Sequence, residues 1–169
     1  MKGSITIEPL GSSHDRTTFS SGVAALDLYL RELATQDAKR RVSNCFVAVA
    51  ADGVIAGYYT FAAASFPLSE LSAKEAKRLP RYPLLPAGLI GRLAVDMRFR
   101  GRRLGGALVM DAVKRATRAD PAVFAIIVDA KDENAAGFYL RLGFRPFSSR
   151  SMSLFVPVST ALEALRERG

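Results

Sequence analysis

The sequence predicts a single α/β domain over residues 1–169, with a mixed central sheet flanked by helices. The length of 169 residues is typical of one domain that buries its own core. Hydrophobic residues make up 49% and charged residues 24%, which is a globular rather than a disordered composition. Strand-like and helix-like patterns alternate along the chain, without an internal repeat or a low-complexity linker.

The first segments predict a short strand and then a helix. Residues 4–8 alternate polar and apolar side chains, as a strand does. From Val23 onward leucines recur at helical spacing, with Ser20 or Ser21 available as the N-cap residue. We expect this helix to end in the basic run 39–41.

A β-hairpin and a surface excursion follow. Residues 44–50 and 55–63 predict two strands joined across an Asp-Gly dipeptide, which is a strong hairpin signal. Residues 65–86 carry four prolines around a short helical stretch, 69–79. This composition indicates an excursion at the surface between two strands of the sheet.

The second half of the chain predicts strand, basic turn, helix and strand. Residues 88–95 form the expected strand, and a helix follows the basic turn. The apolar stripe of that helix consists of Leu104, Leu108, Ala112 and Ala116. Pro121 breaks the helix, and the wholly apolar run 122–128 is typical of a strand covered on both faces.

One more helix and two short strands precede a C-terminal helix. Asp132 is a good N-cap and Gly143 a good stop for the helix between them. Its inner face is expected to carry Ala135, Phe138, Tyr139 and Leu142. The late strands are predicted around Phe144 and at residues 152–158.

The sequence argues against a metal site, a disulfide and a membrane span. Cys45 is the only cysteine and His14 the only histidine, which leaves no Cys/His zinc set and no partner base for a catalytic thiol. We expect Cys45 to be a small core residue. The N-terminus has no apolar signal region, and runs such as 122–128 are far shorter than a bilayer requires. A cytoplasmic location is therefore the default expectation.

The chain is strongly basic, with a net charge of +8 and a pI near 10.1. Such a balance predicts attraction to a polyanion, which could be nucleic acid, a phosphorylated cofactor or an acidic partner protein. Composition does not choose between these partners, and a merely solubilising surface remains an alternative.

The turn after residues 88–95 is a candidate phosphate site. It comprises Arg100, Gly101, Arg102, Arg103, Leu104, Gly105 and Gly106. Amides at a helix N-terminus are unpaired and carry partial positive charge, and glycines let a phosphate approach them. The turn lacks a Walker lysine and the GxGxxG spacing of a dinucleotide fold. A plain helix start with solvated arginines is the alternative.

The sequence resembles the GNAT superfamily of N-acetyltransferases on two motifs. The family's (Gln/Arg)-x-x-Gly-x-(Gly/Ala) pattern falls on Arg100, Arg103 and Gly105, and its Tyr-x-x-x-Gly-Phe pattern falls on Tyr139 to Phe144. The resemblance implies a splayed fourth strand and acetyl-CoA as the acetyl donor. It implies that the turn binds the pyrophosphate, that the backbones of Leu93 and Val95 bind the pantetheine, and that the Val95 amide stabilises the oxyanion. Tyr139 becomes the candidate general acid, whereas a core tyrosine is the alternative.

More narrowly, the chain is similar to the toxin branch of this superfamily, found beside ribbon-helix-helix antitoxins. The segments that carry this likeness are residues 22–30, 57–60, 79–83 and 91–96. The resemblance implies acetylation of the α-amino group of aminoacyl-tRNA, which blocks translation. It also implies a homodimer and an antitoxin partner.

Two residues depart from the superfamily pattern. Arg103 stands where a glycine is usual; an ordinary first-turn residue tolerates arginine, whereas a positive φ would strain it. We expect the first. Asp132 stands where many members have asparagine, and both residues are good caps.

Several cations are candidates for contact with tRNA. They are Lys39, Arg40, Arg41, Lys77, Arg78, Arg81 and Arg98, with Arg92 expected near the acceptor end. Solvated surface charges are the alternative for each one. No side chain stands out as a general base, so we expect water to suffice. Two other functions stay open: acetylation of a protein N-terminus, a lysine or a small amine, and a non-catalytic module that binds CoA or an acidic protein.

Overall fold

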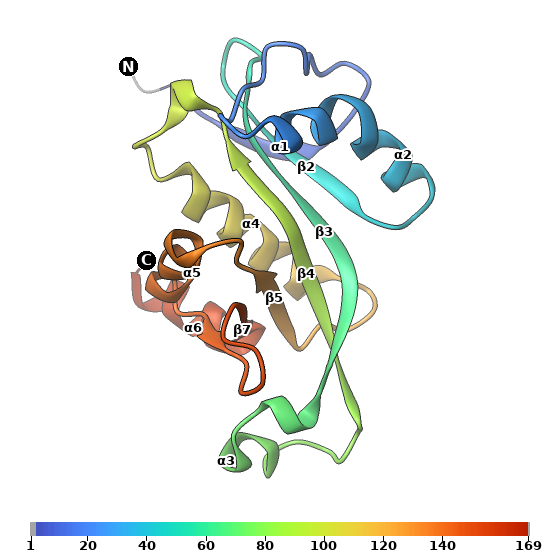
Figure 1. The fold of residues 1–169 in the computed structure, drawn as a ribbon, viewed down its shortest axis with the longest axis vertical. Helices are drawn as coiled ribbons and strands as arrows, with labels where there is room; N and C mark the ends of the chain where they lie inside the picture. The colour runs from blue at the N-terminus through green and yellow to red at the C-terminus, as the bar shows by residue number, and fades with distance from the viewer. Residues whose placement is uncertain (1–2, 169) are drawn as a thin grey trace. The chain divides into compact units, whose positions relative to one another are not determined.

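The computed structural model describes residues 3–168 and contains one seven-stranded sheet in the order β1-β2-β3-β4-β5-β7-β6 (Figure 1). The strands are β1 Thr6–Pro9, β2 Asn44–Val49, β3 Ile55–Pro67, β4 Leu84–Val95, β5 Ala125–Asp129, β6 Arg145–Pro146 and β7 Ser153–Pro157. The α-helices are α1 Ala24–Leu28, α2 Ala34–Lys39, α3 Ala73–Ala76, α4 Leu104–Arg118, α5 Glu133–Arg141 and α6 Val158–Arg168. The predicted α/β fold class, a sheet flanked by helices, is confirmed.

The chain divides into two compact units. The first holds the residues up to Ala62 together with Ile90–Ala112, and the second holds Ala63–Leu89 together with the residues from Val113 onward. Strands β3 and β4 and helix α4 each contribute to both units. That the whole chain forms one domain stays a prediction, which these shared elements support; residues 1, 2 and 169 of it lie outside the described part.

The first unit has its core between the β1–β2–β3 meander and the first helices. These three strands pair antiparallel, and the β2–β3 pair is the predicted hairpin; Gly53 has the positive φ of 86° that its turn needs. The core consists of Phe19, Tyr29, Leu30, Ala34, Cys45, Val47, Ile55, Tyr58 and Ala94. Cys45 is therefore a core residue, as predicted, and burial raises the pKa of its thiol to about 12.

The first helix begins and continues differently from the prediction. The expected serine N-cap is wrong, because Val23 occupies that position and makes no side-chain capping bond. Ser21 instead donates from its amide and its hydroxyl to Asp27 Oδ1, at 2.9 and 2.7 Å. A π-helical segment, η1 (Tyr29–Leu33), separates α1 from α2. This extra residue per turn changes the buried face, which leaves Leu33 exposed and Tyr29 buried.

The second unit has an aromatic core beneath strands β5, β7 and β6, which pair antiparallel. Phe66, Phe147 and Phe155 pack ring to ring there, with centroids 4.9–5.9 Å apart. Strand β4 begins at Leu84, earlier than predicted, and includes Pro86. A proline is tolerated because its carbonyl oxygen accepts the amide of Phe124 at 3.0 Å, a bond that needs no proline N–H.

The excursion is shorter than the predicted 65–86, because β3 continues to Pro67 and β4 begins at Leu84, and the remaining residues 68–83 are less helical than predicted. In place of one helix over 69–79 it has a 3₁₀ turn, η2 (Leu68–Glu70), and the single turn α3, capped by Ser72. The buried Leu71 separates the two, so the chain turns inward where a continuous helix was expected. Glu75 accepts two bonds from Arg145, at 3.0 and 2.7 Å, and Glu70 accepts from Ser149. These carboxylates tie the excursion to the segment that follows α5.

The later helices agree with the sequence patterns. The four residues of the predicted α4 stripe are all buried, and the helix ends at Arg118, before Pro121. Asp132 caps α5 through a 2.8 Å bond from the Ala135 amide. The inner face of α5 is narrower than predicted: Tyr139 is buried, whereas Phe138 and Leu142 are only partly covered.

Two absences hold for residues 3–168. No helix among them has the length and apolar character to cross a bilayer. Within the same range, no three His, Cys, Asp or Glu side chains gather as metal ligands do.

Candidate active site

The end of β4 lies unusually close to β3. A Cβ atom on Gly57 would meet the carbonyl oxygen of Ala94 at 2.9 Å and the side chains of Leu104 and Leu108 at 3.3 and 3.2 Å. Only glycine fits between β4 and helix α4 at this position. In β4 itself, Ala94 is buried, whereas its neighbours Leu93 and Val95 are partly exposed. The two residues expected to bind pantetheine therefore lie on a half-open stretch of strand.

The basic turn leads into α4 with unpaired amides. The first backbone bond of the helix runs from the Ala107 amide to the Arg103 carbonyl oxygen at 3.2 Å. The amides of Arg103 to Gly106 precede that bond and have no intrahelical acceptor. The first turn of α4 contains no acidic residue, so no side chain of that turn competes for this positive end. The turn therefore fits an anionic phosphate group.

Arg103 has a positive φ of 59°, which contradicts the expectation that it is an ordinary first-turn residue. Gly101 has a φ of 78°, whereas Arg102 between them is not in the left-handed region. Such alternation of φ turns successive amides toward one concave side, as in anion-binding nests. The left-handed conformation costs an L-residue about 1 kcal/mol. Arg103 is therefore strained at a position where glycine, the usual residue of the superfamily, would be unstrained.

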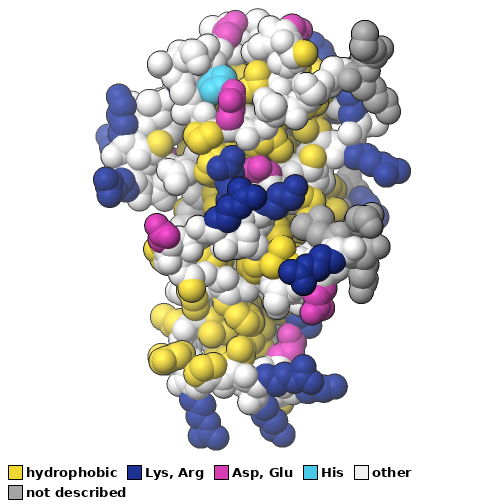
Figure 2. Space-filling model, turned by 180° about the vertical axis from the view of Figure 1, so that it is seen from behind, with side chains coloured by type: hydrophobic (Ala, Val, Ile, Leu, Met, Phe, Trp, Pro, Cys, Tyr) yellow, Lys and Arg dark blue, Asp and Glu magenta, His cyan; other side chains and the backbone are white. Residues whose placement is uncertain are grey.

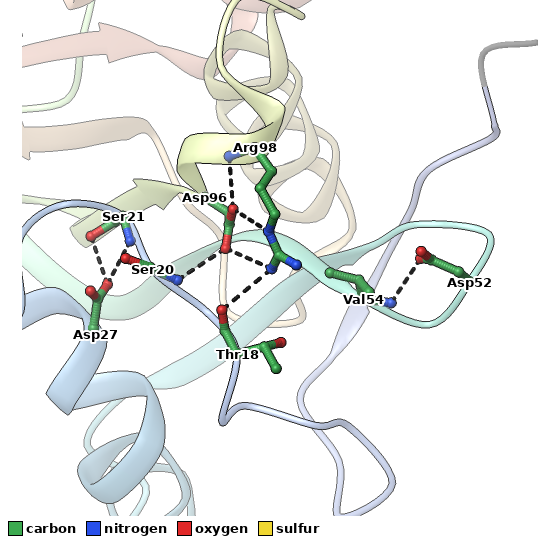
Figure 3. A network of polar contacts seen from close by, with 8 residues as sticks. All are labelled: Thr18, Ser20, Ser21, Asp27, Asp52, Val54, Asp96 and Arg98. Carbon is green, nitrogen blue, oxygen red and sulfur yellow. Dashed lines mark hydrogen bonds and ion pairs between the residues drawn. The ribbon is translucent and has the colours of Figure 1, made fainter.

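Asp96 anchors the turn to the N-terminal segment. Its carboxylate accepts from Arg98 Nε and Nη2, both at 2.9 Å, and from the Ser20 amide at 3.0 Å (Figure 3). Asp96 is buried, and burial alone would raise its pKa, but these bonds together lower the pKa to about 2. The Met97 amide adds a backbone bond to the Ser20 carbonyl oxygen at 2.9 Å. The turn is therefore fixed at its start by a buried anion.

The arginines of the turn have different surroundings. Arg98 is half exposed but bonded to Asp96, and Arg100 donates from Nη2 to the Ser21 carbonyl oxygen at 2.7 Å. The Arg102 guanidinium lies 5.1 Å from the centre of the Phe99 ring. The Arg103 side chain is exposed. The structure thus brings the predicted turn residues together. The guanidinium groups of Arg100 and of Arg98, which precedes the turn, donate to neighbouring protein atoms.

Arg92, the predicted RNA contact on β4, stacks on an aromatic ring. Its guanidinium carbon lies 3.6 Å from the centre of the Tyr29 ring. Its amide donates to Thr60 Oγ1 at 3.0 Å, in place of an ordinary strand bond. These two contacts hold Arg92 in place on β4, three residues before Val95.

Tyr139, in the second unit, is fixed by the motif that carries the family likeness. Helix α5 ends with the Gly143 amide bonded to the Leu140 carbonyl oxygen and the Phe144 amide bonded to the Tyr139 carbonyl oxygen, both at 3.1 Å. Gly143 has the φ of 100° that this Schellman motif requires, and the Phe144 ring packs on the Tyr139 ring. The Tyr139 hydroxyl has no hydrogen-bond partner among the described residues, and burial raises its pKa to about 12.

The other predicted RNA contacts are surface cations. Lys39, Arg40 and Arg41 are exposed where α2 ends, and Arg41 has the φ of 59° of a Schellman motif without glycine. Lys77, Arg78 and Arg81 are exposed on the excursion. Figure 2 shows lysine and arginine side chains beside apolar ones at the lower end of the view, where α3 lies.

Sequence reasoning missed three elements of the site. It did not foresee the anchoring role of Asp96, although the strand-turn segment that contains it was singled out. It also missed the Ser21–Asp27 bonds and the Tyr29 platform beneath Arg92. The available signal for the role of Asp96 was its place in the sequence, directly after a strand and two residues before an arginine. Nothing local signalled the other two.

Comparisons with known proteins identify relatives of this chain. The model of the acetyltransferase (GNAT) family matches residues 13–144. A protein of Mycobacterium tuberculosis named tRNA-acetylating toxin is 34% identical over 146 residues, which cover 85% of this chain and 86% of the relative.

Two solved structures are similar over nearly their whole length. One is a tyrosine-to-phenylalanine mutant of KacT, with 30% identity, a TM-score of 0.85, and coverage of 95% of this chain and 98% of the other. The second is AtaT complexed with acetyl-methionyl-tRNAfMet, with 27% identity, a TM-score of 0.87, and coverage of 96% and 99%.

Proposed function

Because the chain belongs to the GNAT family of acetyltransferases, which use acetyl-CoA, we propose that it acetylates the α-amino group of aminoacyl-tRNA and so blocks translation as a toxin. The relative named tRNA-acetylating toxin and the AtaT complex with acetyl-methionyl-tRNAfMet support this substrate. The basic net charge of +8 suits an RNA substrate.

One observation carries the donor half of the proposal: the nest of unpaired amides from Arg103 to Gly106. Acetyl-CoA, when bound, supplies an activated thioester, and its pyrophosphate is the dianionic group that such a helix start binds. Gly101 and Arg103 provide the alternating backbone conformation, and the exposed Arg102 and Arg103 add charge. The whole set is Arg100, Gly101, Arg102, Arg103, Leu104, Gly105 and Gly106.

The backbone of β4 is proposed to hold the reacting end. Leu93 and Val95 would hydrogen-bond the pantetheine arm, and the Val95 amide would donate to the thioester oxygen as negative charge develops there. Gly57 contributes indirectly, since its lack of a side chain lets β4 and α4 approach β3.

Tyr139 is proposed to be the general acid. As the substrate nitrogen bonds to the acetyl carbon and the carbon–sulfur bond breaks, the Tyr139 hydroxyl gives its proton to the departing thiolate. With a pKa of about 12 the phenol is fully protonated at neutral pH. Its hydroxyl is not engaged by any described residue, so it is available to a ligand. Water takes the proton that the amine loses, and solvent restores the phenol proton.

The exposed cations are proposed to follow the RNA backbone. They are Lys39, Arg40, Arg41, Lys77, Arg78, Arg81 and Arg98, together with the partly exposed Arg92. An antitoxin of ribbon-helix-helix type, a homodimeric state and a cytoplasmic location belong to the same proposal, and they rest on the likeness to the toxin branch.

The decisive test incubates the protein with labelled acetyl-CoA and compares three kinds of acceptor: bulk charged tRNA, free amino acids and peptides. We expect label to enter charged tRNA and to be released with the aminoacyl group on mild alkaline hydrolysis. Transfer to peptides or small amines alone would replace the proposed substrate with one of those amines. Binding of acetyl-CoA without transfer to any amine would leave a non-catalytic module.

A further inference from the structure

The guanidinium of the partly buried Arg92 lies closer to an aromatic ring than that of Arg102, Arg145 or Arg150, the exposed arginines that also lie over rings. The distance of 3.6 Å from its guanidinium carbon to the Tyr29 ring centre is a face-to-face stacking distance, shorter than the 5.0–5.9 Å at Phe99, Phe147 and Phe155. One face of the guanidinium is therefore covered by the ring. Its N–H groups point outward from the edges of the plane.

Tyr29 is held rigidly. Its side chain is buried, its hydroxyl donates to Asp37 Oδ2 at 2.7 Å, and its ring lies nearly parallel to that of Tyr58, 15° apart in plane. Tyr58 in turn donates to the Leu26 carbonyl oxygen at 2.6 Å. The π segment that begins at Tyr29 turns this ring inward, and such segments are frequent at functional sites.

The guanidinium of Arg92 makes no hydrogen bond and no ion pair with any side chain or backbone group that the structure describes. The nearby carboxylate, Asp37, accepts from Tyr29 instead. Five donors on a fixed plane are thus available to a ligand, and bidentate contact with a phosphate is the recognition that this geometry serves best.

The position of Arg92 along β4 indicates which phosphate group it can reach. The pyrophosphate turn follows Val95, whereas Arg92 precedes Val95 by three residues, roughly 10 Å of strand. If the thioester lies at the Val95 amide, Arg92 lies on the side from which the amine arrives. We propose that Tyr29, held by Asp37, is a positioning residue that fixes Arg92 to bind a phosphodiester in the single-stranded end of the substrate RNA. This inference rests on the proposed function.

The test compares Arg92→Ala, Arg92→Lys, Tyr29→Leu and Tyr29→Phe. We expect Arg92→Ala and Tyr29→Leu to raise the KM for aminoacyl-tRNA about 10-fold, with kcat and the KM for acetyl-CoA within about two-fold of wild type. Tyr29→Phe keeps the ring and should restore most of the affinity. Arg92→Lys keeps the charge but loses the planar guanidinium, so it should not restore the affinity.

A salt titration separates a positioning role from a structural one. Loss of one single-strand phosphate contact should reduce the slope of log KM against log salt by about 0.7 in both variants. The double variant should lose no more than Arg92→Ala alone, because Tyr29 acts through Arg92. Arg150→Ala is the matched control, since it removes an exposed arginine that stacks on Phe147 at 5.9 Å.

The outcomes are distinguishable. An unchanged RNA KM and salt slope in Arg92→Ala would overturn the inference, as would a rise in the KM for acetyl-CoA instead. If Tyr29→Leu unfolds, shown by its melting temperature, Arg92→Ala and Arg92→Lys still decide. If wild type acetylates no tRNA, the proposed function fails; binding of uncharged tRNA by wild type and Arg92→Ala, measured by filter retention, then decides the RNA contact separately.

Discussion

The Asp96 carboxylate receives the Arg98 guanidinium through two bonds of 2.9 Å, from Nε and Nη2. This ion pair lies where β4 ends, just before the basic turn 100–106, and Figure 3 shows it joined to the segment of Thr18 and Ser20. Because one partner is buried and the other half exposed, the pair is an anchor for the turn rather than a mobile surface contact.

Asp96→Asn should destabilise the protein by about 2 kcal/mol at pH 7. The folded pKa of Asp96, about 2, lies below the unfolded value of 3.8. The stabilisation is therefore complete above about pH 5 and is lost as the pH falls through 4 toward 2. Urea unfolding at pH 7 and pH 3 should show a smaller difference between the two pH values in the variant. Asp120→Asn, at an exposed carboxylate after α4, is the control. Equal pH responses in wild type and Asp96→Asn would contradict the assignment.

Arg103 provides a test of strain in the turn. At a φ of 59°, glycine is unstrained, whereas alanine and arginine are not. Arg103→Gly should therefore be more stable than Arg103→Ala by about 1 kcal/mol. Both variants lose the same charge, so both should bind acetyl-CoA with similarly reduced affinity. Thermal unfolding and calorimetric titration measure the two quantities; equal stability of the pair would show that the turn relaxes without a left-handed residue.

Local patterns predicted the parts of the structure that local physics sets. The hairpin at Gly53, the cap at Asp132 and the stop at Gly143 depend on a few adjacent residues, and all three are confirmed. The Tyr-x-x-x-Gly-Phe spacing also has a local cause, since the Phe144 amide must reach the Tyr139 carbonyl oxygen to close the helix. Such features follow from spacing alone.

The features that the sequence did not predict depend on distant contacts. Ser21 does not cap α1, because the buried Asp27 captures its hydroxyl. The left-handed Arg103 adopts a backbone conformation that residue type disfavours, in a turn whose start Asp96 fixes. The π segment that begins at Tyr29 has no sequence signal. The buried ring of Tyr29 packs against Tyr58 of β3. These choices are made by tertiary packing, which overrides local propensity.

Charge reversal on the excursion should weaken RNA acetylation without affecting the donor site. Lys77→Glu and Arg81→Glu each remove an exposed cation and add an anion, and each should raise the KM for aminoacyl-tRNA several-fold. In wild type, log kcat/KM should fall linearly with log salt, more steeply for aminoacyl-tRNA than for acetyl-CoA. Lys114→Glu, an exposed cation on α4, is the control. A flat salt response of the wild type would count against an RNA substrate.

Tyr139→Phe should cut kcat about 100-fold while the Kd for acetyl-CoA stays within two-fold. The phenyl ring keeps the packing against Phe138 and Phe144, so only the proton donor is lost. Because burial raises the pKa of Tyr139 to about 12, the phenol is the protonated, active form throughout the neutral range. The wild-type kcat should therefore show no decline between pH 7 and pH 9, the range in which the aminoacyl ester survives a rapid measurement. A decline near pH 9, or full activity in the variant, would assign the proton to another group. Pre-steady-state transfer to charged tRNA, followed in both proteins, makes the measurement on the chemical step itself.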